Sequence, residues 1–246
     1  MKTLVKLLLL LALSVYLVMA FFNFTQQRDT RVCSSLHVTI TDSTHAAFIS
    51  AAETERLLKA AHLYPVGKQM DEIDGLKIEE TLKKNSVIED VQCYKAPNGV
   101  VNVLITQRMP LMRIMASNGN DYYIDSKGHV MRAQNYVADV VVATGDISPR
   151  FARKELVQLG QFLQNDAFWS NQIEQIYVDN GNKIKLVPRV GGHVIDFGTA
   201  DSIAQKFRNL HTFYQKVLPQ VGWNKYNEIS VEHVSQIVGR KPQGKS

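Results

Sequence analysis

The feature that most constrains this chain is a long apolar segment close to its first residue. Residues 7 to 27 carry no formal charge, and only Ser14, Tyr16 and Asn23 interrupt the apolar part from 7 to 24. As a helix this part is about 27 Å long, close to the roughly 30 Å hydrocarbon core of a bilayer. The segment therefore predicts one transmembrane helix over residues 7–27.

A cleaved signal peptide is the competing interpretation, because Lys2 and Lys6 precede the apolar segment. Apolar regions of signal peptides contain about 7 to 15 residues and end at a small-residue site. This one is longer and ends at Phe21-Phe22, which favours an uncleaved anchor. The short basic flank predicts a cytoplasmic tail of residues 1–6 and an exported remainder.

Composition favours a folded exported part. Hydrophobic residues make up 45% of the chain and charged residues 21%, which allows a real core and excludes a disordered chain. Two cysteines cannot form a four-thiolate zinc site or an iron–sulfur cluster without other ligands. The net charge of +5 permits an anionic partner such as a membrane surface, without requiring one.

A compact α+β module is predicted over residues 33–106. Its patterns follow the order strand, helix, helix, strand, strand, and the helices would cover the apolar face of a small sheet. The helices begin at a capping box of Ser50 with Glu53 and at Asp74, and Pro97-Asn98-Gly99 turns between the last two strands. The strands are expected at residues 36–41, 91–94 and 101–105.

A mixed, β-rich domain with two helices is predicted over residues 107–239, followed by a polar tail of residues 240–246. Short alternating segments separated by glycine turns indicate strands, which we expect to form an antiparallel meander over residues 111–143. The helices are expected to begin near Ser148, before Pro149, and near Ile203. Further strands are expected at 173–178, 183–187, 194–197 and 228–238.

Two short motifs add to this domain order. One is Gln107-Arg108-Met109-Pro110, and the other runs from Tyr122 to Gly128 as Tyr-Tyr-Ile-Asp-Ser-Lys-Gly. Together they resemble the bacterial cell-division family FtsQ, also named DivIB, whose members commonly show Glu-Arg-x-Pro and Tyr-x-Ile-Asp-x-x-Gly. The first helix, the POTRA module (polypeptide-transport-associated) and the β domain follow in the family's order. The chain departs from the family at Gln107, where relatives commonly have glutamate, and at Glu232, where they tend to have arginine.

This resemblance implies a non-enzymatic, single-pass scaffold in the bacterial inner membrane, with a cytoplasmic amino terminus, a periplasmic bulk and enrichment at the division site. It implies that small coiled-coil proteins of the FtsB and FtsL type add a strand beside the carboxy-terminal strand, while other division proteins contact the POTRA-like module. Backbone pairing at an exposed strand edge gives this a physical basis. By position, the expected partner-binding residues are Glu232, His233, Val234, Ser235, Gln236, Ile237 and Val238.

Two alternatives stay open. The segment 232–238 is equally consistent with an ordinary strand that closes its own sheet, although Lys225, Arg240 and Lys241 near it could protect an edge or attract an acidic partner. The chain could also be a POTRA-containing envelope transport or outer-membrane assembly factor. Tandem modules and a following barrel would be expected there, and the sequence shows one module.

No catalytic, cofactor or metal site is predicted. The match of residues 239–246 to a phosphate-loop pattern is expected to be chance, because such a loop needs a helix after it. The seven histidines lack metal-ligand spacing. Asp125, before a glycine turn, is expected to hydrogen-bond its own backbone. Basic residues are not interleaved with aromatic ones, so no nucleic acid is expected. Cys33 and Cys93 could form one disulfide, but the family fold places a strand between theirs and favours free thiols.

Overall fold

The computed structural model describes residues 2–25, 30–41, 47–132 and 136–242, with the side chains of the first helix described from residue 6 to 21. The chain divides into two compact units. The first contains residues 1–39, 51–82 and 91–104, and the second contains 40–50, 83–90 and 105–246.

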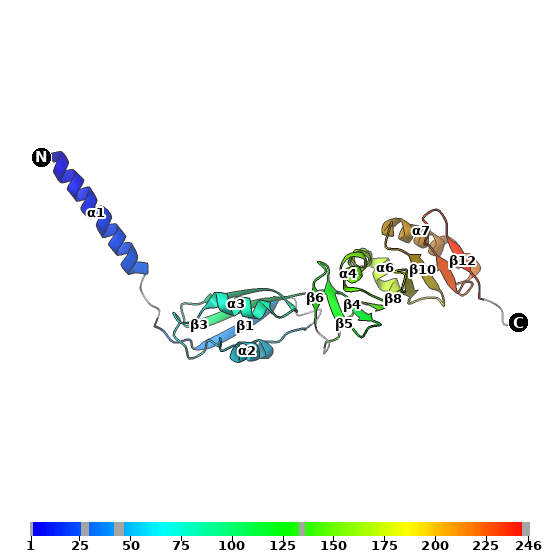
Figure 1. The fold of residues 1–246 in the computed structure, drawn as a ribbon, viewed down its shortest axis with the longest axis horizontal. Coiled ribbons are helices and arrows are strands. Elements are labelled where there is room, and N and C mark those ends of the chain that lie inside the picture. Colours follow the sequence, from blue (N-terminus) through cyan, green and yellow to red (C-terminus); the bar gives the residue numbers. More distant parts are fainter. Residues whose placement is uncertain (1, 26–29, 42–46, 133–135, 243–246) are drawn as a thin grey trace. The chain divides into compact units, whose positions relative to one another are not determined.

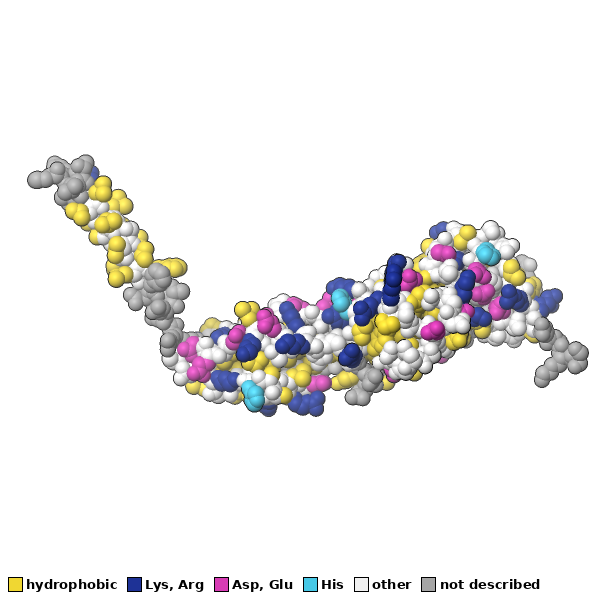
Figure 2. All heavy atoms as spheres, in the orientation of Figure 1, with side chains coloured by type: hydrophobic (Ala, Val, Ile, Leu, Met, Phe, Trp, Pro, Cys, Tyr) yellow, Lys and Arg dark blue, Asp and Glu magenta, His cyan; other side chains and the backbone are white. Residues whose placement is uncertain are grey.

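The first helix, α1, spans Lys2–Thr25. Its large apolar side chains between Leu7 and Phe21 are 53 to 73% exposed, and Figures 1 and 2 show this helix and its hydrophobic surface. Among the residues that the structure describes, no helix combines the length and apolar content needed to cross a membrane. The transmembrane helix therefore remains a prediction.

The α+β module predicted over residues 33–106 has the predicted order of elements. Its three strands form a sheet in the order β1-β3-β2, and every second residue of β3 is buried. Helix α3 begins after Asp74, whose Oδ1 accepts a hydrogen bond from Lys77 N at 3.0 Å, as its predicted capping role requires. The elements are β1 (Ser35–Thr41), α2 (Ala51–Ala60), α3 (Gly75–Lys83), β2 (Ile88–Lys95) and β3 (Val100–Gln107).

The remaining strands form one nine-stranded sheet, in the order β12-β11-β10-β9-β8-β7-β4-β5-β6. Figure 1 shows its strands along the chain from green to red. The bounds are β4 (Pro110–Ala116), β5 (Asp121–Asp125), β6 (Val130–Met131), β7 (Val141–Gly145), β8 (Ile173–Val178), β9 (Ile184–Pro188), β10 (Val194–Gly198), β11 (Glu228–Ser230) and β12 (Val238–Arg240).

The predicted antiparallel meander over residues 111–143 is confirmed for β4, β5 and β6, which pair antiparallel in chain order, and is wrong for β7. Strand β7 pairs in parallel with β4 on one side and with β8 on the other, and β10 pairs in parallel with β11. Helices connect β7 to β8 and β10 to β11, and such crossovers bring the next strand back in the same direction. The spacing of strand patterns along a sequence does not reveal these directions.

The predicted helix after Ser148 begins as expected, because Ser148 Oγ accepts a hydrogen bond from Phe151 N at 3.2 Å. It is not one continuous α-helix, since a π-helical turn covers Ala152–Leu156, and a separate helix, α6, follows. Asp166 caps α6 through hydrogen bonds from Phe168 N and Trp169 N. The helices are α4 (Pro149–Phe151), α5 (Val157–Asn165), α6 (Ala167–Gln172), α7 (Ile203–Lys216) and α8 (Leu218–Val221).

Close packing of α5 on β4 depends on Gly160. A Cβ atom at this position would lie 2.5 Å from Met112 Cε, closer than real contacts allow, and 3.0 Å from Leu111 Cδ2, so these buried side chains would have to move. Met112 and the α5 side chains Leu159 and Leu163 are buried in the same apolar core, which α7 joins through Phe207. This core holds the sheet in place and thereby fixes the position of its last strand.

Candidate partner-binding surface

Strand β12 forms one end of the nine-stranded sheet. It pairs antiparallel with β11, with Val238 opposite Ser230 and Arg240 opposite Glu228, and no other described strand lies beside it. Arg240 O accepts a hydrogen bond from Asn227 N at 3.0 Å, so the peptide groups of Arg240 face inward. Neighbouring residues of a strand point their peptide groups in opposite directions. The N–H and C=O of Gly239 therefore face the open edge.

A glycine is required at this edge. A Cβ atom on residue 239 would lie 2.7 Å from two ring carbons of Tyr226, which is too close for any side chain without movement of the ring. Tyr226 packs against the apolar core of the domain and makes a ring contact with Phe213. Gly239 therefore allows β12 to pass directly over this aromatic side chain.

The predicted strand over residues 232–238 is wrong. Of its seven residues only Val238 lies in a strand, and the others form a loop between β11 and β12. The loop includes a turn in which Gln236 N donates to His233 O at 3.3 Å, and Asn209 Nδ2 donates to Val234 O at 2.8 Å. The chain must reverse here, because β12 runs antiparallel to β11, and α7 supplies the hydrogen bond that holds the loop.

Four of the predicted residues line a groove of about 410 Å³ between this loop and α7. Val234 on its rim is 45% exposed, whereas Ile237 packs against the core. The groove residues are Val234, Ser235, Gln236 and Ile237 from the loop, with Asn209, Thr212, Phe213, Lys216 and Val217 from α7 and its end. The groove and the open edge of β12 together form the candidate partner-binding surface.

The sequence did not indicate the contribution of α7. Phe213 and Val217 belong to a helical apolar stripe that predicts burial in the core, and both also line the groove. Asn209 and Lys216 carry no motif. The nearest signal was the position of Phe213 in that stripe, because a residue at the margin of an apolar face contacts both the core and whatever covers the helix.

Ion pairs cover the neighbouring face of the sheet. Lys183 pairs with Glu232, and this hydrogen-bonded contact lowers the pKa of Glu232 and raises the pKa of Lys183. Glu228 pairs with Arg240 and lies 3.8 Å from Lys185 Nζ. Two residues with predicted roles at the edge, Glu232 and Arg240, are therefore neutralised by partners within the domain.

The two sequence motifs meet at the other end of the β-rich domain. Asp125 Oδ1 accepts hydrogen bonds from Lys127 N at 2.8 Å and His129 N at 2.7 Å, which confirms its predicted turn role. Its Oδ2 forms an ion pair with Arg108 Nη1 at 2.6 Å. Burial alone raises the pKa of Asp125, but hydrogen bonds from Arg108, His129 and Lys127 outweigh it and lower this pKa.

Arg108 also binds the backbone at the start of β2 and just before it. Its Nε donates to Ser86 O at 3.3 Å and its Nη2 to Ile88 O at 3.2 Å. The side chains of Arg108 and Asp125 are only 14% and 6% exposed. Because the donors and acceptors of both side chains are used within the protein, this network is structural, and it joins segments of the second unit that are far apart in sequence.

The described residues offer little that suggests chemistry. They contain no group of three histidine, cysteine or acidic residues that could hold a metal ion. Cys33 and Cys93 are free thiols. Cys33 lies just before β1 and Cys93 lies in β2, and β3 separates these two strands in the sheet. Burial, with a smaller contribution from Glu79, raises the pKa of Cys93 to about 11, so this thiol is a poor nucleophile at neutral pH.

Comparison with known families gives two matches. Residues 31–106 match the model of the POTRA-like domain, and residues 109–240 match the model described as FtsQ/DivIB, C-terminal related. No curated protein matches the chain. The second match covers more than half of the chain and includes the whole nine-stranded sheet, from β4 to β12. The chain therefore belongs to the FtsQ/DivIB C-terminal-related family and carries a POTRA-like domain before that part.

Proposed function

We propose that this protein is a membrane-anchored scaffold of the bacterial division machinery that recruits small coiled-coil proteins of the FtsB and FtsL type by strand addition. Family membership supports a division scaffold of a generally non-catalytic kind. The observation that carries the proposal is the open edge of β12, which exposes the peptide groups of Gly239. An added strand forms hydrogen bonds with such peptide groups, and this backbone pairing places few demands on which side chains are present.

The proposed contacts differ from those that the sequence predicted. The added strand pairs with Val238–Arg240, while residues 234–237 contact the partner through side chains, because they line the groove beside α7. The apolar part of that groove, with Phe213 and Val234, can receive one hydrophobic side chain of the partner. Backbone pairing then supplies affinity, and the groove supplies selectivity.

The anchor in this proposal is α1. Support comes from the uncharged segment of residues 7–27 and from the exposed apolar side chains of α1, which contact no core. A basic flank before the segment favours a cytoplasmic amino terminus and a periplasmic bulk. The POTRA-like module follows the anchor directly in the sequence, and in this proposal it contacts other division proteins near the membrane. The match over residues 109–240 favours this function over a transport or outer-membrane assembly factor.

Hydrogen exchange on the full chain tests the proposal, with and without the organism's own FtsB- and FtsL-type proteins. The amide of Gly239 should exchange at least tenfold more slowly in the complex, because an added strand uses its N–H. The amides of β6, at the opposite end of the same sheet, serve as a control and should not change. Formation of the complex without protection of Gly239 would contradict strand addition at β12.

A further inference from the structure

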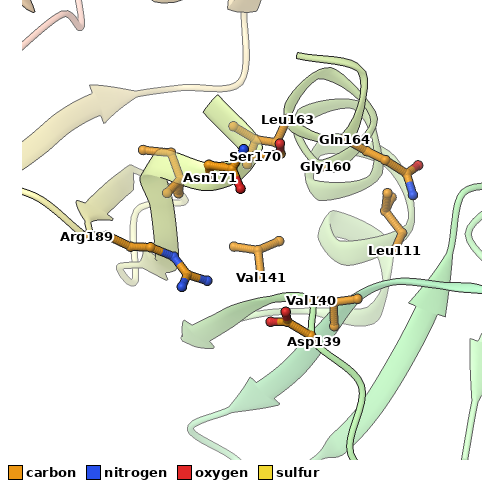
Figure 3. Close-up of a pocket in the computed structure, with 11 residues that line it drawn as sticks. Leu111, Asp139, Val140, Val141, Gly160, Leu163, Gln164, Ser170, Asn171 and Arg189 are labelled. Carbon is orange, nitrogen blue, oxygen red and sulfur yellow. The ribbon is translucent and has the colours of Figure 1, made fainter. Parts of the chain in front are cut away.

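A second cavity lies in the β-rich domain, several strands away from β12 in the sheet order. Its volume is about 320 Å³, which is at the lower end of the range for ligand pockets, so it suits a small molecule. Figure 3 shows the residues that line it. They come from β4, the segment just before β7, the beginning of β7 and β8, helices α5 and α6, and the residue after β9.

The base of this pocket is apolar. Leu163 and Ile173 are buried in the domain core, and Val141 lies at the centre of the view in Figure 3. Gly160 contributes backbone where a side chain would collide with Met112. A ligand in this pocket must therefore place a small apolar group against Val141 and its neighbours.

One side of the pocket offers hydrogen-bond acceptors. Ser170 Oγ and Asn171 Nδ2 both donate to Ala167 O, at 3.3 and 2.7 Å, so the hydroxyl lone pairs and the amide Oδ1 remain to accept. Helices α5 and α6 end beside the pocket, and helix carboxyl ends carry partial negative charge. On the other side of Val141 in Figure 3, the exposed carboxylate of Asp139 adds a full negative charge. These groups favour a ligand that has an ammonium group and a further hydrogen-bond donor.

The opposite charge comes from Arg189. Its backbone N donates to Gln172 O at 2.7 Å, which holds this residue beside the end of α6. In Figure 3 its guanidinium points toward Val141, as does the carboxylate of Asp139. Within the described part of the chain, neither Arg189 nor Asp139 takes part in an ion pair. The pocket therefore presents one carboxylate and one guanidinium, both available to a ligand.

We propose that this pocket binds a small zwitterion of dipeptide size with a free ammonium group and a free carboxylate. The carboxylate of the ligand pairs with the guanidinium of Arg189, whose geometry favours two parallel hydrogen bonds. Its ammonium group pairs with Asp139, and its peptide N–H donates to Ser170 or Asn171 on the other side of Val141. Its apolar side chain lies on Val141. The inference uses residues outside the partner-binding surface and does not depend on the proposed function.

Calorimetric titration of the full chain in detergent micelles tests this inference with alanyl-leucine as the probe. N-acetyl-alanyl-leucine lacks the ammonium group, and alanyl-leucinamide lacks the carboxylate. We expect saturable binding of alanyl-leucine and at least tenfold weaker binding of both blocked forms. Arg189→Gln should bind alanyl-leucine no more tightly than it binds alanyl-leucinamide. Asp139→Asn should bind alanyl-leucine no more tightly than it binds N-acetyl-alanyl-leucine.

Two controls separate the pocket from general effects. Arg208→Gln removes an exposed guanidinium on α7, outside the pocket, and should leave binding unchanged. Val141→Phe places bulk at the base and should abolish binding, while circular dichroism verifies that each variant is folded. Absence of saturable binding by the unmodified chain would overturn the inference. The inference would also be overturned if folded Arg189→Gln and Asp139→Asn bound each of the three probes as tightly as the unmodified chain does.

Discussion

The two ends of the β-rich domain differ in how they use polar groups. Near β5, Arg108 and Asp125 are almost completely buried, and their donors and acceptors bind other parts of the protein. At β12, the peptide groups of Gly239 face an open edge, and Val238 is 42% exposed. The first region is complete in the isolated chain, whereas the second has backbone capacity for another chain.

This difference teaches which part of the molecule carries stability and which part carries recognition. A buried ion pair holds segments of one domain together, and removal of one partner leaves an uncompensated charge. An exposed edge contributes little to folding but offers a continuous row of donors and acceptors. Substitutions near β5 should therefore change stability, and substitutions near β12 should change binding at nearly constant stability.

The largest expected effect is at Asp125. Asp125→Ala leaves the guanidinium of Arg108 buried without its carboxylate and also removes the acceptor for two backbone amides, so we expect a loss of about 3 to 5 kcal/mol of unfolding free energy. Urea unfolding of the full chain in micelles measures this change. Asp121→Ala is a matched control, because its partner Arg113 is more exposed, and it should cost much less. Similar costs for both variants would contradict the comparison.

The sequence was informative where structure depends on neighbouring residues. Asp74 and Ser148 cap helices as predicted, and Asp125 forms its turn, because each side chain binds backbone two to four residues away. The POTRA-like order of elements follows from the same local patterns. The ion pair of Asp125 with Arg108 was not predicted, because the two residues are far enough apart that only the fold brings them together.

The candidate surface was harder to predict for a related reason. Alternation over residues 228–238 suggests one strand, yet a hydrogen bond from Asn209 to Val234 O and the return of the chain to form β12 produce a loop. The sequence located the region near the carboxyl end but assigned its backbone edge to the wrong residues. The groove residues on α7 were not predicted, because the apolar pattern of this helix indicates only a buried face.

The next effect concerns binding rather than stability. Val234→Asp places a charge at the rim of the groove, where an apolar partner side chain is proposed to lie, so the affinity for the FtsB- and FtsL-type proteins should fall about tenfold, or about 1.4 kcal/mol. Val190→Asp, at a similarly exposed valine outside the groove, is the control. Surface plasmon resonance with the full chain measures both. Unchanged affinity for folded Val234→Asp would remove the groove from the proposed surface.

A smaller effect depends on pH. His193 is 2% exposed, its Nε2 lies 2.6 Å from the hydroxyl of Tyr214, and burial lowers its pKa. The unfolded chain therefore takes up a proton near pH 6.5, whereas the folded chain does so only at lower pH, and stability falls as the pH decreases through this range. Between pH 7 and 5.5 we expect this histidine to contribute a loss of about 1 kcal/mol. Above pH 7 it contributes no pH dependence.

Urea unfolding at both pH values, with His193→Gln for comparison, measures this contribution. The glutamine variant should lose about 1 kcal/mol less than the unmodified chain over the same interval, whatever its absolute stability. His211→Gln, at a half-buried position on α7, removes a different histidine and serves as the comparison variant. An identical pH dependence for His193→Gln and the unmodified chain would show that His193 is protonated as readily in the folded state.

The smallest effect tests whether the face beside β12 really contributes little to folding. Glu232→Gln removes the ion pair with Lys183, in which both side chains are about a third or more exposed. Solvent screens such a pair, so the unfolding free energy should fall far less than in Asp125→Ala, and the difference should shrink further in 0.5 M salt. A loss as large as that of Asp125→Ala would mean that the edge region is as tightly built as the region near β5. The division between a stabilising end and a binding end would then no longer hold.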